Sequence, residues 1–400
     1  MTVRVNKSSF NIREKFSELG RKFGLKGSEL AAAETVQEAR NIVSAGRKNI
    51  LVNGSMMIAQ RATQVTGQTG AGYKTCDRWR INISSLGTWT IDQSTDAPPG
   101  FGNSLKVTCT TANASPGSTN NMIVQQRLEG RSLQCLAWGT DSAKEFTISF
   151  YVKSSKTGNA SLAVLNNDNG NIMVSFPYTI LSANTWEYKT ITVPAYTAGA
   201  FDNDNARSMQ IEWWLNSGTH YTGAGTHQTE WAALSQTERN SSNLGIGRAV
   251  NDTWQIAGVQ MEIGRNATDF EHRSFSEELA LCQRYYCKSY NPERSPGAGT
   301  SDGIQVIRNY DPNNSRSDHP AGVQFPVTMR DIPNITFYSQ NGTVNKFTIG
   351  NTTCGSFVNQ NGAMGNILLK GTNSIGGISF STTVPAASFA YFHFTAESEL

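Results

Sequence analysis

The sequence predicts a mainly β protein that begins with a short α-helical segment. A jelly-roll-like antiparallel β-sandwich, a short helix and a second, smaller C-terminal β-sandwich follow it. Two observations favour this order. From about residue 49 onward, short runs of β-branched and aromatic residues alternate with clusters of Gly, Pro, Asn, Asp and Ser. Helical spacing of apolar residues is confined to residues 1–48 and to a stretch near residue 280.

Residues 1–48 are expected to form an attachment segment of two amphipathic helices. Ser9 and Ser28 can cap these helices, and each helix carries apolar residues along one face. Neither apolar stripe is long enough for a coiled coil of its own, so each needs something to bury against. A helical hairpin packed on its own domain is one solution, and docking on another protein or on copies of the chain is the other. The residues predicted for docking are Ile12, Arg13, Phe16, Leu19, Arg21, Lys22 and Phe23.

Residues 49–290 are predicted to hold the first sandwich and its terminal helix. Many short strands with no helix between them are typical of an antiparallel sandwich rather than of a parallel α/β sheet. The predicted strands are 50–58, 78–83, 88–91, 104–108, 122–126, 146–152, 160–165, 172–176, 187–193, 209–215 and 254–263. All eight Trp residues fall within this part of the chain.

A helix and a loop separate the two sandwiches. Ser274 and Glu277 have capping-box spacing, and Leu281, Tyr285 and Lys288 follow on one helical side. The loop 291–303 carries two Pro and three Gly, so residues 291–400 are assigned to the second sandwich. Its predicted strands are 304–308, 322–328, 334–338, 346–349, 367–370, 378–380 and 390–395.

Composition excludes several classes of protein. Lys and Arg number 34 against 31 Asp and Glu, a net charge of +3, which is too weak for nucleic-acid binding through bulk charge. No run of 18 apolar residues occurs, so no membrane insertion is expected. The charged N-terminus is unlike a signal peptide. Without one, the six cysteines, which form no Cys-x-x-Cys pair, are expected to be reduced thiols of a protein made in a cytoplasm.

Catalytic and metal-binding motifs are absent, so no enzyme activity, cofactor or metal is predicted. The segment from Gly299 through Ser301 to Gly303 spells a nucleophile elbow, but a predicted strand follows it instead of the helix that this motif requires. Glu212, Glu230 and Glu262 could supply a carboxylate pair for glycoside hydrolysis. A polysaccharide-degrading protein is therefore the less favoured alternative.

Aromatic residues in a polar setting predict a glycan site. Trp213 and Trp214 are adjacent, so on a strand one faces the core and the other faces outward. Trp231 lies in the polar stretch 223–243, together with His227. A flat apolar ring beside polar groups suits a sugar, so Trp214, His227 and Trp231 are the predicted glycan-binding residues. The alternative is that these aromatic rings fill the core or seal a subunit interface.

The segment Asp77-Arg78-Trp79 is predicted to be architectural. A strand-borne Trp flanked by opposite charges fits a buried ring with an Asp–Arg pair at the edge of a sheet.

Several motifs resemble segments of bacteriophage tail-fibre and receptor-binding appendage proteins, including those of marine phages. The motifs occur at both ends and in the centre of the chain, at residues 6–15, 49–54, 58–61, 76–79, 260–264, 269–274, 278–285, 325–330 and 394–400. This resemblance implies a homotrimeric virion protein that attaches to the phage tail or an adaptor through residues 1–48. It also implies that the β domains recognise a glycan or protein on the host surface. A purely structural tail adaptor or head-decoration protein is the alternative.

The last residues of the chain are consistent with a trimer. Within 390–394, the large aromatics Tyr391, Phe392 and Phe394 are interleaved with smaller residues. A monomer would leave part of this apolar surface in water, which is rare for large patches. Apolar surface alone fits any symmetric interface, so the number three comes from the resemblance.

Overall fold

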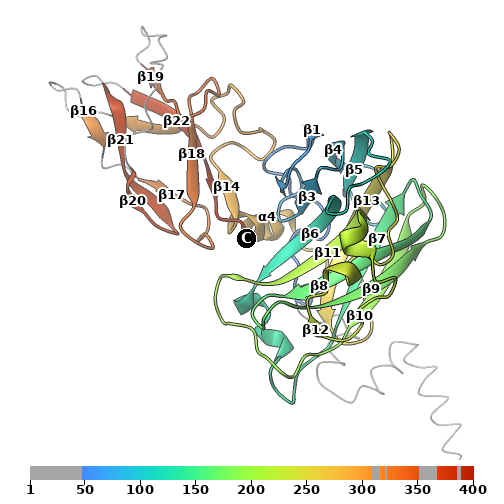
Figure 1. Cartoon of the computed structure of the whole chain (residues 1–400). Coiled ribbons are helices and arrows are strands. Elements are labelled where there is room, and N and C mark those ends of the chain that lie inside the picture. Colours follow the sequence, from blue (N-terminus) through green and yellow to red (C-terminus); the bar gives the residue numbers. More distant parts are fainter. Residues whose placement is uncertain (1–46, 309–312, 314–315, 320–321, 351–366, 385–388) are drawn as a thin grey trace, which may run out of the picture.

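The computed structural model describes residues 47–400 except 309–312, 314–315, 320–321, 351–366 and 385–388 (Figure 1). It confirms the mainly β, antiparallel fold class. The helices predicted within residues 1–48 lie outside the described residues, as do the attachment residues Ile12, Arg13, Phe16, Leu19, Arg21, Lys22 and Phe23. Among the helices that are described, none is long and apolar enough to span a bilayer.

The first sandwich consists of two antiparallel sheets that lie face to face (Figure 1). One sheet has the strand order β1-β4-β5-β13-β7-β10, with bounds Gln64–Gln68, Thr88–Ser94, Ser104–Thr111, Thr253–Ile263, Phe146–Ser154 and Glu187–Val193. The other has the order β12-β9-β8-β11-β6-β3-β2, with bounds Ala232–Ala233, Ile172–Ile180, Gly158–Asn166, Arg207–Ser217, Asn121–Glu129, Arg80–Ser84 and Gly72–Tyr73. Three single-turn 3-10 helices (Gly130–Ser132, Gln134–Leu136 and Gln236–Glu238) and the short α3 (Thr219–Thr222) lie in its loops.

Alternation along the strands separates a core face from an outer face. On β7, Phe146, Ile148 and Phe150 are fully buried in the core, whereas Tyr151 on the outer face is only partly buried. Trp79 and Trp213 meet in the same core with ring centroids 5.5 Å apart. Alternating residues on a strand therefore divide between the core and the outer face, as the predicted antiparallel sandwich requires.

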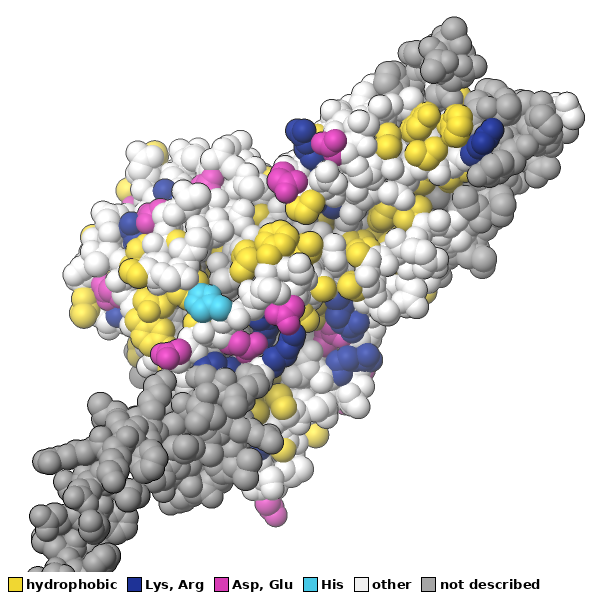
Figure 2. Space-filling view, turned by 180° about the vertical axis from the view of Figure 1, so that it is seen from behind, with side chains coloured by type: hydrophobic (Ala, Val, Ile, Leu, Met, Phe, Trp, Pro, Cys, Tyr) yellow, Lys and Arg dark blue, Asp and Glu magenta, His cyan; other side chains and the backbone are white. Residues whose placement is uncertain are grey.

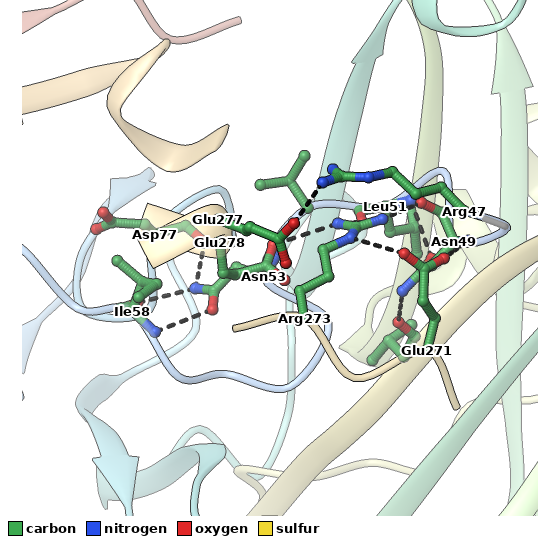
Figure 3. Close-up of polar contacts among 12 residues, drawn as sticks. Arg47, Asn49, Leu51, Asn53, Ile58, Asp77, Glu271, Arg273, Glu277 and Glu278 are labelled. Carbon is green, nitrogen blue, oxygen red and sulfur yellow. Dashed lines mark hydrogen bonds and ion pairs between the residues drawn. The ribbon is translucent and has the colours of Figure 1, made fainter. Parts of the chain in front are cut away.

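The predicted strand 50–58 is wrong, because this segment is buried irregular chain. Asn53 and Met56 adopt left-handed conformations with φ of 57° and 59°, which end any extended run. The Asn53 amide donates to the Ile58 and Asp77 carbonyl oxygens at 2.8 and 2.9 Å (Figure 3). Side-chain amides thus satisfy backbone groups that a sheet would otherwise pair.

The short helix forms as predicted but ends earlier. α4 (Phe275–Gln283) carries the capping box between Ser274 and Glu277. The chain then turns into β14 (Tyr286–Lys288), which pairs with β22 (Phe389–Glu397). Lys288 therefore belongs to a sheet of the second sandwich, although the sequence placed it on the helix.

The described residues of the second sandwich also form two sheets. In one, β22 pairs with β14 and with β15 (Gln305–Arg308), β18 (Asn334–Tyr338) and β19 (Thr348–Gly350). In the other, β21 (Ser374–Val384) pairs with β16 (Arg316–His319), β17 (Val323–Gln324) and β20 (Ile367–Lys370). Phe337 and Phe392 pack in the core with centroids 5.6 Å apart.

Buried ions join the two sandwiches, and this corrects one prediction. Asp77 and Arg78 do not pair with each other. Asp77 lies 3.6 Å from Arg61, and Arg78 binds Glu399 near the end of the chain. Trp79 is buried as predicted, and its indole nitrogen donates to the Asn53 carbonyl at 2.9 Å.

The chain enters the first sandwich beside α4 (Figure 3). Arg47 pairs with Glu277 at 2.7 Å, and Arg273 donates to the Leu51 carbonyl at 3.1 Å and lies 3.1 Å from Glu271. These contacts attach residues 47–51 to α4 and to the segment that precedes it.

Candidate ligand-binding cleft

An aromatic cleft of about 340 Å³ opens on the outer face of the six-stranded sheet. Its floor is formed by β7, β10 and β13, and its walls are the loops 99–101 and 267–272. Exposed hydrophobic side chains and a histidine also gather on the first sandwich in the view of Figure 2. The cleft is within the range of volumes that small-ligand sites occupy in proteins.

A tight turn delivers Phe101 to the cleft. The Phe101 amide donates to the Pro98 carbonyl at 3.1 Å, and Gly100 between them has φ of 89°. Proline followed by a glycine with positive φ is the signature of a type II turn, so the local sequence Pro98-Pro99-Gly100-Phe101 dictates this geometry.

A bulge in β13 makes room for the Phe101 ring. The pairing of β13 with β7 shifts register between Ala257 and Gln260, and Gly258 within the shift has φ of 59°. A Cβ atom at Gly258 would lie 2.6 Å from the Phe101 ring. Glycine is therefore required both by the backbone conformation and by the close approach of the ring.

Two groups of aromatic rings line the cleft, and a contact between Phe101 and Tyr151 joins them. Phe101 contacts Phe270 edge-on, with centroids 4.9 Å apart, and His272 at 5.2 Å. Tyr151 and Tyr188 are cross-strand partners with centroids 4.9 Å apart, and Tyr151 lies 5.8 Å from Phe101. Tyr188 is 46% exposed, so its ring is available to a ligand.

Polar groups stand beside these rings. Ser149 and Thr268 line the cleft, and burial raises the pKa of Tyr188. The Thr268 amide and hydroxyl donate to Glu262 at 2.8 and 2.6 Å, and the Glu271 amide donates to Gln260 at 2.8 Å. Glu262 and Gln260 of β13 thus hold the loop 268–271, which forms one wall of the cleft, against the sheet in the absence of a ligand.

The predicted ring at Trp214 is on the expected face but is not exposed. Trp213 lies in the core and Trp214 on the opposite face of β11, as alternation requires. Trp214 is nevertheless 0% exposed, because Tyr221 packs on it at 4.9 Å and Arg239 covers it at 5.0 Å. Its indole nitrogen donates to Glu212 at 3.0 Å. The ring has no free face for a sugar.

The other predicted glycan residues lie elsewhere on the molecule. Trp231 is partly buried, with its ring 5.0 Å from Trp138 and its nitrogen donating to the Pro194 carbonyl at 2.8 Å. His227 contacts the hydroxyls of Ser175 and Ser242 at 3.3 and 2.9 Å. In the described part of the chain, Trp214, His227 and Trp231 make no hydrogen bond or ring contact with one another, and none of the three lines the cleft.

Two of the candidate catalytic carboxylates, Glu212 and Glu262, lie on different sheets. Glu212 on β11 is bound by Arg239 at 2.6 Å, and Glu262 on β13 accepts the Thr268 bonds in the other sheet. Glu230 is exposed in a loop, and Ser301 lies in a loop that leads into β15. Within the described ranges, no cluster of three His, Cys, Asp or Glu residues could hold a metal ion, and Cys76, Cys109, Cys135, Cys282 and Cys287 are free.

The cleft is lined by no Trp residue, so the Trp pattern that predicted a glycan site does not point to it. Tyr151 and Tyr188 occupy outward positions in strands that were correctly predicted. The signal in the sequence that could have indicated the cleft is an aromatic residue at an outward position on each of two predicted strands. Which strands are neighbours is decided only by the tertiary structure.

No protein-family model and no curated protein matches the chain. Among solved structures, the enzymatically active domain of bacteriophage CBA120 tailspike protein 4 is similar at a TM-score of 0.30 and 13% identity, over 54% of this chain and 21% of that one. The family 11 carbohydrate-binding module of a Clostridium thermocellum cellulase has a TM-score of 0.27 and 11% identity, over 50% of this chain and 99% of the module. The C-terminal family 22 carbohydrate-binding module of Clostridium thermocellum Xyn10B has a TM-score of 0.25 and 14% identity, over 48% and 89%. At these TM-scores none of these proteins determines the function of this chain.

Proposed function

We propose that this protein is a non-enzymatic receptor-binding appendage of a phage virion, and that it binds a host-surface glycan in the aromatic cleft. The observation that carries the proposal is the convergence of Phe101, Tyr151 and Tyr188 with hydroxyl groups on a pre-formed surface. Sugar rings bind through the apolar faces of their C–H groups, which stack on aromatic rings, and through hydroxyls, which need polar partners.

The virion part of the proposal has a separate basis. It rests on the motifs that resemble phage appendages and on the predicted attachment segment 1–48, which would dock on the tail or on an adaptor. The contacts of Arg47 and Lys48 with the segment 268–277 fix the position where this segment joins the first sandwich. A homotrimer in the virion tail completes the proposal.

Binding to host envelope polysaccharide tests the function directly. Affinity electrophoresis should show retardation of the full chain, weakened in Tyr188→Ala and unchanged in Val250→Ala, an exposed apolar residue that does not line the cleft. A folded Tyr188→Ala protein that binds as the unchanged chain does would remove the cleft from the proposal.

Reducing-end release separates binding from catalysis. Incubation of the polysaccharide with the full chain should release no new reducing ends, and sustained release would favour a polysaccharide-degrading tailspike instead. A chain that incorporates into virions but is neither retarded by polysaccharide nor adsorbed to cells would be a structural adaptor.

Light scattering should give three times the chain mass of 43.6 kDa, and a monomer at micromolar concentration would contradict the trimer.

A further inference from the structure

A second aromatic platform adjoins the cleft along the same two strands. Trp186 directly precedes β10, and Lys153 is the next outward residue after Tyr151 on β7. Because Glu187 pairs with Val152, the same register places Trp186 opposite Lys153, one row beyond the pair of Tyr188 and Tyr151. Two residues along a strand span about 6.6–6.8 Å, so the two rows are neighbours on one face.

Contacts with Asp96 hold this second row in place. The Trp186 indole nitrogen donates to Asp96 at 3.2 Å, and Lys153 binds the other oxygen of Asp96 at 2.8 Å. Gln255 on β13 donates to the same carboxylate at 3.2 Å, and the Lys153 ammonium lies 6.0 Å from the Trp186 ring centre. The Lys153 hydrogen bond lowers the pKa of Asp96, so this carboxylate stays ionised.

The opposite end of the cleft does not offer a comparable surface. There Ser149 and Thr190 form the next row, and the row beyond them is Thr147 and Thr192, whose hydroxyls donate to the carbonyls of Gly264 and Arg265 at 2.7 and 3.1 Å. The segment 264–265 is thereby tied across the ends of β7 and β10. A ligand that fills the cleft can therefore extend along the sheet toward Trp186.

We infer that the ligand is an oligosaccharide of at least two sugar units, with one unit in the cleft against Tyr188 and the next on Trp186. This inference rests on the proposed function and deepens it. The second row combines the partly buried Trp186 ring with the ion pair of Lys153 and Asp96, whose charges balance. Such a row suits a neutral unit whose hydroxyls accept from the ammonium and donate to the carboxylate.

A length series tests this inference. The probes are mono- to hexasaccharides prepared by mild acid hydrolysis of the host envelope polysaccharide, with affinities from titration calorimetry. For the unchanged chain, affinity should increase from the monosaccharide to the di- or trisaccharide and then level off. Trp186→Ala should weaken binding of the longer ligands by about fivefold to tenfold, the size of one aromatic stacking contact, and leave monosaccharide affinity unchanged.

Three further variants separate the possible outcomes. Tyr188→Ala should weaken every length, Val250→Ala none, and Trp186→Phe should retain most of the long-ligand affinity because it keeps a ring face. If the unchanged chain binds no ligand in the series, the proposed function and this inference both fail. If it binds but Trp186→Ala affects all lengths equally or none, the inference fails and the glycan-binding function stands.

Discussion

The two outer faces of the first sandwich both carry aromatic residues, but the loops cover these rings to different extents. On the six-stranded sheet, Tyr151 and Tyr188 remain partly or largely exposed and Phe101 comes from a short turn at the rim. On the seven-stranded sheet, the long connection between β11 and β13 folds back, so that Tyr221 and Arg239 cover Trp214 completely. An outward position on a strand is therefore not equivalent to exposure, because the loops decide which outward side chains meet water.

The largest expected effect is a loss of stability from a substitution on the outer face of the seven-stranded sheet, where loops cover Trp214. Trp214→Ala should lower the free energy of unfolding by about 3–5 kcal/mol, as truncation of other buried large aromatics does. It leaves a cavity under Tyr221 and removes the indole donor of Glu212. Urea denaturation followed by circular dichroism measures the loss, and polysaccharide affinity of the folded fraction should be unchanged. Normal stability with lost affinity would instead support the glycan role predicted from the sequence.

The second largest effect is expected at the bulge in β13, under the cleft of the six-stranded sheet. Gly258→Ala should destabilise the protein by about 2–3 kcal/mol, because it forces an L-residue to a positive φ and pushes the Phe101 ring aside. Glycan affinity should also fall. In the double variant Gly258→Ala/Phe101→Ala the clash is absent, so stability should partly recover while affinity stays low. Equal destabilisation with and without Phe101 would show that backbone strain alone is responsible.

Removal of the Tyr188 ring, on the outer face of the six-stranded sheet, should reduce glycan affinity but have little effect on stability. Tyr188→Ala should weaken glycan affinity about tenfold, corresponding to about 1.4 kcal/mol, because a stacking surface and a hydroxyl are both lost. Since Tyr188 is 46% exposed, the melting temperature should change by only a few degrees, about what 1 kcal/mol or less produces. Tyr188→Phe keeps the stacking surface and should lie between the two. A large drop in melting temperature would mean that the ring is structural, as Trp214 is.

The smallest effect concerns His227 on the covered side. Burial lowers the pKa of His227 below its usual 6.5, so the folded protein binds its proton less readily than the unfolded chain. The contribution of His227 to stability is therefore complete above pH 6.5 and is lost as the pH falls through the lowered folded-state pKa. The variant His227→Gln should show a shallower loss of stability between pH 7 and pH 5. Identical pH profiles for the two proteins would mean that His227 does not contribute.

The sequence alone determined the fold class and the positions of most strands. Alternation of apolar and polar residues reports directly on which side chains a sheet buries, and the capping box at Ser274 and Glu277 is a purely local arrangement. The irregular segment 50–58 was mistaken for a strand, because its apolar residues are buried without sheet pairing. The burial of Trp79 was predicted, but the partners of Asp77 and Arg78 were not, since both come from distant parts of the chain.

Only the tertiary structure assembles the cleft in which ligand binding is proposed. The cleft needs β10, β7 and β13 as neighbours, and these strands are far apart in sequence. Its rim comes from residue 101 and from residues 267–272, which a pattern read along the chain cannot bring together. The choice between Trp214 and Tyr188 depended on how a loop packs over a sheet. Exposure is a property of the whole packed molecule, whereas inward and outward alternation is a property of the strand itself.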